Sequence, residues 1–597
     1  MPTIIPDNHL FITFVKRKIS KTMKRILVSI LTVLGISAAA ANTAAANTAA
    51  ANTTADTAAA SADGRKTTIF LAGDSTCATK ELDKQNPERG WGHMLQPFFD
   101  SQIVVSNHAR NGRSTRSFRT EGLWDNMIGR VAVGDYVFIQ FGHNDSKEDS
   151  RYSSPEQYAE NLRAFVREVR AKGATPVLLT PIVRRKWVDG VLTDTHGDYP
   201  AQMKRVAAEE SVTLIDMEAA TRDWVSSMGD EGSKSCFMWV EAGTCPLHPD
   251  GRQDDTHLNV RGARLLAAMT ADRMAEAFPE LAAHRTDYDY VVAKDGSGDY
   301  FTVTELVDNL PDFTKEGEVR VLIRNGVYKE KVSIPQTKTF VHLIGESVEG
   351  TILTYDDYAA RRNARGKKIG TSGSSSLYIC APDFTAENIT FDNSAGRVGQ
   401  AVAVQCIGDR MVFRNCRFTG NQDTLYLYGH GNRDGEAGYV PNSRIYLCDC
   451  YIEGTTDFIF GSAVACLERC RIHSKQDSYI TAASSCEGQP YGFVFVDCDF
   501  TADEGVTRCW LGRPWRDYAQ TVMVNCRLGG HIVPAGWENW GRREAEKRVC
   551  YAEYGNTGAG AEVSGRVKWS KQLRPRQAAR YTPAAVLAGS DGWNPTK

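Results

Sequence analysis

The chain has 597 residues, and its 70 Lys and Arg against 72 Asp and Glu leave a formal net charge of only -2. That length exceeds one ordinary domain, for which about 100–200 residues is typical. Hydrophobic residues make up 42% and charged residues 24% of the chain, which excludes wholesale disorder and a polytopic membrane protein. The balanced charge also disfavours a nucleic-acid partner, because no global basic field is present to attract phosphate.

The first 64 residues differ from the rest of the chain. Met23 is followed by two basic residues, a mostly apolar run over 26–36 and small residues over 37–41. This order is typical of a secretory signal peptide, and the apolar run is shorter than the roughly 20 residues that span a bilayer. We expect a signal region over 1–41, with Met23 a candidate initiator, and a low-complexity linker over 42–64. The expected location is secreted or periplasmic, with no membrane span after signal removal.

Between residues 67 and 278, apolar runs alternate with stretches of helical spacing. The runs are continuously apolar, as in parallel strands buried on both faces, and cover 68–72, 103–105, 136–140, 177–180 and 212–215. Helical spacing over 156–171, 201–210 and 260–277 supplies the crossovers of a doubly wound α/β domain with a parallel sheet. Ligands of such domains bind beyond the carboxyl ends of the strands, so a site is expected there.

Chemically active residues gather in the polar segments predicted for that edge. Ser75 is a candidate nucleophile, His257 can take its proton, and Asp254 lies three residues before His257, so that one turn can hold both side chains. Gly112, which lacks a Cβ, and the Asn144 amide are candidate oxyanion donors. Each residue alone has an ordinary explanation, such as a turn or a surface histidine. Their joint occurrence predicts serine-dependent acyl transfer.

The segments that carry these residues resemble the four blocks of SGNH (GDSL-type) hydrolases, in particular the rhamnogalacturonan acetylesterase group. They are Gly73-Asp-Ser-Thr76, 107–114, Gly142-His-Asn-Asp145 and Asp254-x-x-His257. The resemblance covers about residues 67–280 and implies an acetylesterase domain over 65–285. It implies Ser75 as nucleophile, His257 as base and Asp254 as its orienting partner. The Ser75 N–H, the Gly112 N–H and Asn144 would form the oxyanion hole.

From residue 288 the helical pattern gives way to short β-branched and aromatic runs with a repeat. Its copies share a cysteine, at Cys416, Cys450, Cys470, Cys498 and Cys526, with spacings of 34, 20, 28 and 28 residues. Such a repeat predicts a parallel β-helix with loops of different length. We expect these cysteines to stack inside as small buried groups rather than to form a disulfide ladder. Cys236 and Cys245, which flank a short loop in the first half, are the candidate disulfide.

Two carboxylates share a phase in this repeat. Asp423 comes seven residues after Cys416, and Asp457 seven after Cys450. Equal phase would place them in register on strands about 4.8 Å apart, where like charge leaves one acid protonated beside one carboxylate. That pair suits a general acid and a nucleophile, although a polar turn ladder is the alternative. The same count from Cys470 gives Asp477, which this geometry does not exclude.

Further residues near the pair suit the chemistry of a sugar ester. Gln422 is a neutral donor for an oxyanion, Arg513 can pair with a carboxylate, and the face of Trp515 can stack on a sugar. The motifs of this half include Gly420-Asn-Gln-Asp-Thr-Leu-Tyr426, Gly454-Thr-Thr-Asp-Phe-Ile-Phe-Gly461 and Leu511-Gly-Arg-Pro-Trp515, with others over 293–299, 326–330 and 400–404. They resemble pectin methylesterase (pectinesterase) over about 288–570.

This second resemblance implies a right-handed parallel β-helix domain over 286–597. Asp457 would be the nucleophile, Asp423 the acid and then the base, and Arg513 the partner of Asp457. Gln400 and Gln422 would donate to the oxyanion. Trp515, Phe460 and Tyr426 would bind substrate. The resemblance gives Asp477 no catalytic role, and Asn421 stands where many relatives have tyrosine.

Together the two halves predict an exported bifunctional pectin esterase. One domain would remove acetyl groups from rhamnogalacturonan or homogalacturonan, and the other would demethylate galacturonan and release methanol. Neither step needs a metal or cofactor, and the expected partner is a pectic polysaccharide or oligogalacturonide. A pectate lyase or polygalacturonase fused to an esterase is one alternative. A non-catalytic carbohydrate-binding solenoid, in which Ser75 and the aspartate pair would be dispensable, is the other.

Overall fold

The structure, a computed structural model, describes residues 65–315, 317–429 and 443–596. The expected signal region and linker, 1–64, lie outside the described residues. No helix in the described ranges is both long and apolar enough to cross a membrane.

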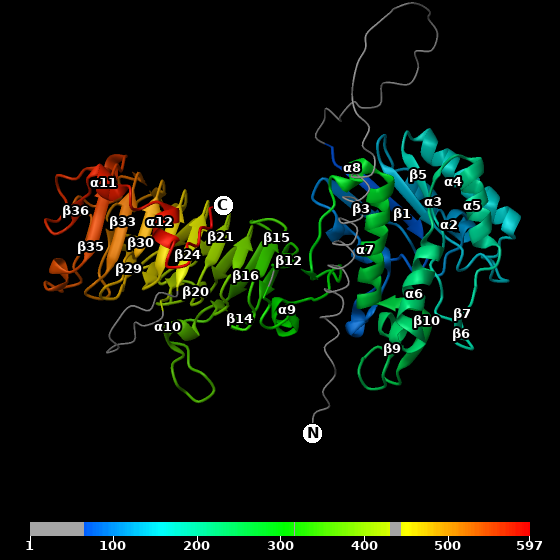
Figure 1. The fold of residues 1–597 in the computed structure, drawn as a ribbon, viewed down its shortest axis with the longest axis horizontal. Coiled ribbons are helices and arrows are strands. Elements are labelled where there is room, and N and C mark those ends of the chain that lie inside the picture. The colour runs from blue at the N-terminus through cyan, green and yellow to red at the C-terminus, as the bar shows by residue number, and fades with distance from the viewer. Residues whose placement is uncertain (1–64, 316, 430–442, 597) are drawn as a thin grey trace, which may run out of the picture. The chain divides into compact units, whose positions relative to one another are not determined.

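A parallel sheet of five strands forms the centre of the first half (Figure 1). In sheet order, its strands are β3 (Ile103–Asn107), β1 (Thr67–Gly73), β4 (Tyr136–Gln140), β5 (Thr175–Leu179) and β8 (Thr213–Ile215). Leu71 belongs to one buried apolar cluster and Phe70 to another, because successive side chains of a strand point to opposite faces. The sheet is therefore buried on both sides, as its continuous apolar strands predict.

Helices cover this sheet, and a small antiparallel sheet adjoins it. The longer helices are α4 (Pro155–Ala171), α5 (Tyr199–Glu209), α6 (Met217–Ser233) and α7 (Val260–Ala277), and the shorter ones are α2 (Thr115–Thr120), α3 (Leu123–Ile128) and α8 (Pro279–Ala282). The antiparallel sheet has the order β2 (Glu88–Arg89), β10 (Arg252–Asn259) and β9 (Phe237–Val240), and a hairpin joins β6 (Trp187–Val188) to β7 (Val191–Leu192). Strand β1 lies where the chain turns from one half of the parallel sheet to the other, the usual place for a site in this architecture.

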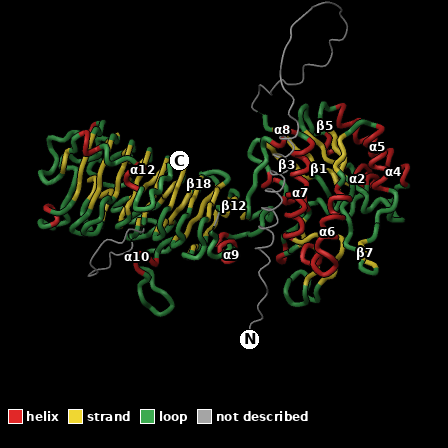
Figure 2. The backbone as a smooth tube through the Cα atoms, viewed as in Figure 1, coloured by secondary structure: helices red, strands yellow, loops and turns green. Residues whose placement is uncertain are grey.

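The second half is a parallel β-helix made of three long sheets (Figures 1 and 2). The first contains β11 (Tyr290–Val292), β12 (Val319–Ile323), β15 (Val341–Gly345), β18 (Thr385–Glu387), β21 (Met411–Arg414), β24 (Arg444–Cys448), β27 (Val464–Glu468), β30 (Phe493–Val496), β33 (Gln520–Val524), β35 (Cys550–Tyr554) and β36 (Lys571–Gln572). The second contains β13 (Gly326–Lys329), β16 (Thr351–Tyr355), β19 (Thr390–Asn393), β22 (Arg417–Thr419), β25 (Tyr451–Gly454), β28 (Arg471–Ser474), β31 (Asp499–Ala502) and β34 (Arg527–Leu528).

The third sheet contains β14 (Val332–Ile334), β17 (Leu377–Ile379), β20 (Val404–Cys406), β23 (Leu425–Leu427), β26 (Ile459–Gly461), β29 (Tyr479–Ala483) and β32 (Trp510–Gly512). Short helices flank the three sheets: α9 (Val303–Asn309), α10 (Gly370–Gly373), α11 (Pro575–Ala578) and α12 (Pro583–Leu587). The two-domain fold class that the sequence predicts, an α/β domain followed by a parallel β-helix, is confirmed.

The residue before each repeat cysteine explains the corner between the first two sheets. All five residues before the repeat cysteines have φ between 46° and 55°, in the left-handed region. Four of them are asparagine or aspartate, at Asn415, Asp449, Asp497 and Asn525, and the fifth is Arg469. Asparagine and aspartate adopt this conformation more readily than other side chains. A two-residue corner is therefore enough to turn the chain from one sheet into the next, as it does between β21 and β22.

The cysteine that follows each corner points into the β-helix core. The five repeat cysteines are at most 2% exposed, and every cysteine of the described chain is free. The column is thus a stack of buried thiols, as predicted. The predicted bond between Cys236 and Cys245 is wrong: Cys236 Sγ lies 3.9 Å from Met228 Sδ, and Cys245 Sγ lies 3.9 Å from the Gln85 carbonyl.

Candidate active sites

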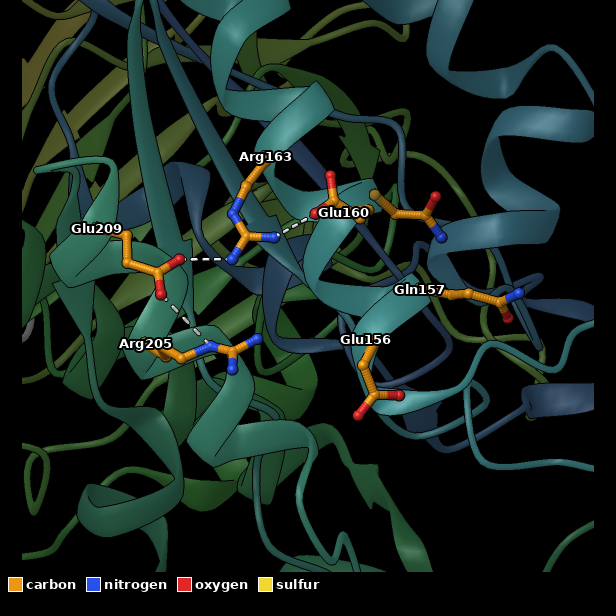
Figure 3. Close-up of a pocket in the computed structure, with 7 residues that line it drawn as sticks. Glu156, Gln157, Glu160, Arg163, Arg205 and Glu209 are labelled. Carbon is orange, nitrogen blue, oxygen red and sulfur yellow. Dashed lines mark hydrogen bonds and ion pairs between the residues drawn. The ribbon is translucent and has the colours of Figure 1, made fainter.

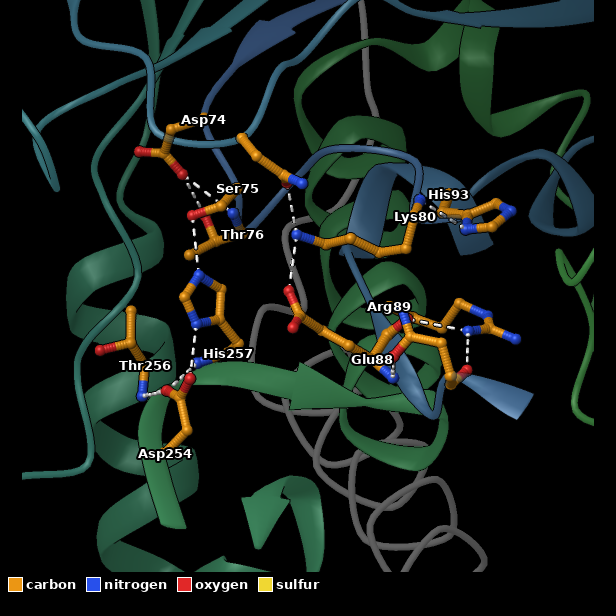
Figure 4. A network of polar contacts seen from close by, with 12 residues as sticks. Asp74, Ser75, Thr76, Lys80, Glu88, Arg89, His93, Asp254, Thr256 and His257 are labelled. Carbon is orange, nitrogen blue, oxygen red and sulfur yellow. Dashed lines mark hydrogen bonds and ion pairs between the residues drawn. The ribbon is translucent and has the colours of Figure 1, made fainter. Parts of the chain in front are cut away.

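Ser75, His257 and Asp254 form a hydrogen-bonded triad at the end of β1 (Figure 4). His257 Nε2 lies 2.9 Å from Ser75 Oγ, and His257 Nδ1 lies 2.8 Å from Asp254 Oδ2. The other carboxylate oxygen, Oδ1, accepts the Thr256 and His257 N–H groups at 2.8 and 3.0 Å. Burial raises the pKa of Asp254, but the hydrogen bonds and charge of His257 outweigh it, so this pKa lies well below its usual range.

The two acid–base residues stand on a strand rather than in the expected turn. Strand β10 changes register between Asp254 and Leu258. This irregularity allows Asp254 and His257, which are three residues apart and would face opposite sides of a regular strand, to meet. The spacing was therefore informative, but the local structure predicted for it was wrong.

The predicted oxyanion donors lie on loops that are tied to one another. Asn144 is 4% exposed, and its Nδ2 donates to the Arg113 carbonyl at 3.0 Å, next to Gly112. Gly112 has φ +74°, a conformation that favours glycine. Ser75 itself is held by a tight turn, in which Asp74 Oδ1 accepts the Thr76 N–H at 2.9 Å. The structure thus brings together the residues of an acyl-transfer site.

Asp423 and Asp457 occupy equivalent positions on neighbouring turns of the β-helix. Leu425 pairs with Ile459, so each aspartate stands two residues before a paired position, and the Asp423 N–H donates to the Thr456 carbonyl at 3.1 Å. Both aspartates have left-handed φ, 67° and 49°, and are 8% and 5% exposed. The predicted pair of in-register carboxylates is therefore present.

Arg513 distinguishes the two carboxylates. Its Nε donates to Asp457 Oδ1 at 3.0 Å and its Nη2 to Oδ2 at 2.6 Å, the bidentate geometry that makes an arginine–carboxylate pair strong. The guanidinium lies between two aromatic rings, 3.9 Å from the centroid of Tyr479 and 3.7 Å from that of Trp540. These contacts fix the plane of the guanidinium, so Asp457 is held in one orientation.

The electrostatics separate the protonation states of the pair. Burial, and then the charge of Asp457, raise the pKa of Asp423 well above its usual value, while Arg513 opposes them. Burial also raises the pKa of Asp457, and the hydrogen bonds and charge of Arg513 offset only part of that rise. The shared proton therefore belongs on Asp423, beside an ionised Asp457.

The remaining predicted residues of the β-helix surround this pair. Gln400 and Gln422 face each other across an isolated parallel bridge, and the Ala401 N–H donates to the Gln422 carbonyl at 3.0 Å. Tyr426 and Phe460 stack at 4.2 Å between ring centroids, with Trp515 at 6.3 Å from Tyr426 and 5.9 Å from Phe460. Trp540, which contacts the guanidinium that binds Asp457, packs against the same aromatic cluster.

Asp477 does not belong to the site. Ile459 pairs with Thr481, so the residue in phase with Asp457 is Tyr479. The pairing offset between these two turns changes from one sheet to the next. Tyr451 pairs with a residue 20 positions later, whereas Ile459 pairs with one 22 positions later, so the later turn has two extra residues between its paired positions. Asp477 is exposed and accepts the Thr507 and Arg508 N–H groups at 2.8 and 2.9 Å. The sequence analysis allowed that Asp477, seven residues after Cys470, lies in register with Asp423 and Asp457, and that position is wrong.

Tyr479 and Trp540 were missed by the reasoning from sequence. Tyr479 lies in register with Asp457, and it could have been found if the number of residues in that turn of the β-helix had been known. Trp540 stands in a loop after β34 and carries no repeat signal.

A pocket on α4 and α5 holds none of the predicted residues (Figure 3). Its charged side chains pair with one another: Arg163 lies 2.6 Å from Glu160 and 2.5 Å from Glu209, and Arg205 lies 3.6 Å from Glu209. It is a solvated charged surface rather than a site. Among the described residues, no group of three His, Cys, Asp or Glu side chains is arranged to hold a metal ion.

Comparison with known families matches the two halves separately. The model of the family described as Pectinesterase matches residues 289–590, and that of the GDSL-like Lipase/Acylhydrolase family matches 71–265. Pectinesterase 31 of Arabidopsis thaliana is 40% identical over 298 residues, which cover 49% of this chain and 89% of that protein. Pectinesterase QRT1 of the same plant is 39% identical over 313 residues, or 51% and 78%. The predicted resemblances to pectinesterases and to GDSL-type hydrolases are confirmed.

Among solved structures, the pectin methylesterase from carrot is 33% identical. The match covers 51% of this chain and 95% of the carrot chain, with a TM-score of 0.46.

Proposed function

Because the chain belongs to the pectinesterase family and also contains a GDSL-like acylhydrolase domain, we propose that it removes two kinds of ester from pectin. The β-helix, 286–597, demethylates galacturonan. The first domain, 65–285, removes acetyl groups from rhamnogalacturonan or homogalacturonan. One observation supports the demethylation activity most directly: Arg513 holds Asp457 as a carboxylate beside Asp423, whose pKa is raised.

Demethylation begins when an Asp457 oxygen attacks the carbonyl carbon of the methyl ester. The side chains of Gln400 and Gln422 donate to the oxyanion of the tetrahedral intermediate. Asp423 then gives its proton to the departing methoxy group, so methanol leaves and an acyl–Asp457 anhydride remains. The Asp423 carboxylate next takes a proton from water, which attacks the anhydride, frees the galacturonate and restores both aspartates.

Deacetylation follows the same two-step logic with a serine nucleophile. His257 Nε2, 2.9 Å from Ser75 Oγ, takes the hydroxyl proton as Oγ attacks the acetyl carbonyl. Asp254 holds the imidazole through Nδ1 and stabilises the imidazolium. The Ser75 and Gly112 N–H groups and Asn144 stabilise the oxyanion. His257 gives its proton to the departing sugar oxygen, which leaves as a hydroxyl, and then takes a proton from the water that hydrolyses the acetyl-serine.

Export of the enzyme is part of the proposal. The order of basic, apolar and small residues over 23–41 supports a cleaved signal, and a secreted or periplasmic location would give the enzyme access to pectin. Sequencing the N-terminus of the mature protein tests it: a start beyond residue 36 supports cleavage, and an intact N-terminus contradicts it.

The activities are tested by measuring methanol and acetate from acetylated, methylated homogalacturonan and rhamnogalacturonan. We expect both methanol and acetate. The polymer from which acetate is released identifies the acetylated substrate. Unsaturated uronide ends would instead indicate a lyase and new reducing ends a polygalacturonase. Binding without either product would indicate a non-catalytic solenoid.

A further inference from the structure

A line of charged side chains continues from the triad of the first domain, and Figure 4 labels two of its members, Lys80 and Glu88, together with the triad. It starts at Asp254 Oδ2, which accepts from His257 Nδ1 at 2.8 Å and also from Arg252 Nη2. Arg252 Nη1 in turn donates to Glu88 Oε2 at 2.9 Å. The carboxylate that orients the imidazole is therefore shared with a guanidinium.

The line ends beside the oxyanion loop. Glu88 Oε1 lies 2.8 Å from Lys80 Nζ, which donates to Asn111 Oδ1 at 2.6 Å. The Lys80 side chain is 3% exposed and that of Glu88 12%. Such buried ions persist when each is paired, so removal of any one leaves a neighbour uncompensated.

These residues come from four segments, each of which carries or adjoins part of the machinery. Lys80 is five residues after Ser75, Asn111 adjoins Gly112, and Arg252 is two residues before Asp254 on β10. Glu88 stands on β2, which pairs with β10. The charges therefore bridge the nucleophile loop, the oxyanion loop and the acid–base strand.

We propose that Lys80, Glu88 and Arg252 are positioning residues for the deacetylation reaction, and that Arg252 also sets the lower pH limit of that reaction. The inference rests on the proposed acetylesterase activity of this domain. Lys80 and Glu88 hold the oxyanion loop in register with the triad. Arg252 draws charge from the Asp254 oxygen that faces the imidazole and so opposes formation of the imidazolium.

The sign of the pH effect follows from the groups around the imidazole. Asp254 contacts it, and Glu88, Asp74 and His143 lie close enough to interact with its charge. Without Arg252, its two carboxylate partners, Asp254 and Glu88, act on the imidazole with less compensation. A positive charge on the ring is then better stabilised through Asp254 Oδ2, which Arg252 no longer shares, and the imidazolium cannot act as the base.

The test measures acetate release against pH, with kcat and KM, for the full-length chain and its variants. Arg252→Met should move the acid limb of kcat/KM upward by about one pH unit, and Arg252→Lys, which keeps the charge, should largely restore it. Lys80→Met should lower kcat roughly tenfold to a hundredfold with a smaller change in KM, with partial rescue in Lys80→Arg. Arg167→Met removes an exposed pair with Glu210 and serves as the matched control.

The outcomes separate the inference from the proposed function. An unmoved acid limb in Arg252→Met, or equal profiles for Arg252→Met and Arg252→Lys, would overturn the role of Arg252. Lys80→Met with full kcat would overturn the positioning network. Since a misfolded variant would also lose activity, circular dichroism and the labelling of Ser75 by a fluorophosphonate accompany each measurement. Full acetate release by Ser75→Ala would instead show that the proposed acetylesterase function of this domain is wrong.

Discussion

Asp423 and Asp457 stand at equivalent positions of neighbouring β-helix turns, but Arg513 binds only Asp457. The symmetry of the repeat places the two carboxylates side by side, and one arginine from a later turn breaks that symmetry. The broken symmetry gives one residue the role of an acid and the other that of a nucleophile.

Asp457→Asn should abolish methanol release, because an amide cannot form the acyl intermediate. We expect a loss of at least about 10³-fold, measured as initial methanol release from methylated galacturonan. Asp477→Asn is the matched control, since Asp477 is exposed and accepts the backbone N–H groups of Thr507 and Arg508, which lie outside the site. An inactive Asp477→Asn variant together with an active Asp457→Asn variant would show that the nucleophile had been assigned to the wrong turn of the β-helix.

Methanol release should follow a bell-shaped pH profile. Burial and the charge of Asp457 raise the pKa of Asp423, so its proton persists to higher pH, and the alkaline limb marks its loss. Burial also raises the pKa of Asp457, and the acid limb marks protonation of the nucleophile. Both limbs belong to the coupled pair. A profile without an alkaline limb would contradict an acid role for Asp423.

Asp423→Asn should slow methanol release by roughly 10²–10⁴-fold, the usual contribution of a general acid–base. The amide can neither protonate methanol nor activate water. The measurement is kcat across the pH range of the parent enzyme, again with Asp477→Asn as control. Near-normal kcat at any pH in that range would reject the assignment.

Arg513→Lys should lower kcat roughly tenfold to a hundredfold and move the acid limb to higher pH. Lysine keeps the charge but loses the two parallel hydrogen bonds to Asp457 and the flat surface between Tyr479 and Trp540. Arg527→Lys, at an exposed pair with Asp499, controls for the substitution itself. Equal profiles for Arg513→Lys and the parent would mean that Arg513 does not tune Asp457.

The sequence was most informative where a repeat or a strand end fixed the position of a residue. The 34-residue spacing of Cys416 and Cys450 equals the pairing offset of their strands, so the count to Asp423 and Asp457 succeeded. It failed at Asp477 because the next turn adds two residues after its corner. Counting from the repeat cysteine predicts the position of a residue only while the number of residues between the corner and the next strand is the same in each turn.

Contacts between distant segments were beyond the reach of the sequence. Glu88 and Arg252 are 164 residues apart, and Arg513 and Asp457 are 56 apart. No local pattern links such residues, and only the resemblance implied the Arg513 contact. The charged line from Asp254 to Asn111 has no motif, since it depends on how β2 and β10 pair.

Asn144→Ala should lower kcat for acetate release by roughly 10²–10³-fold, the usual effect of losing one oxyanion donor. KM should change less, because the donor acts mainly on the charge that develops in the transition state. Methanol release by the same preparation serves as the internal control. A changed KM with unchanged kcat would make Asn144 a binding residue instead.

The central claim is that one chain carries two independent ester hydrolases, and paired assays on one acetylated, methylated pectin test it most directly. Acetate and methanol are measured together for the parent, Ser75→Ala, Asp457→Asn and the double variant. The control is Ser227→Ala, at an exposed serine of α6. We predict that Ser75→Ala loses acetate release alone, that Asp457→Asn loses methanol release alone, and that the double variant loses both. Loss of both products in either single variant, or full acetate release by Ser75→Ala, would contradict the account.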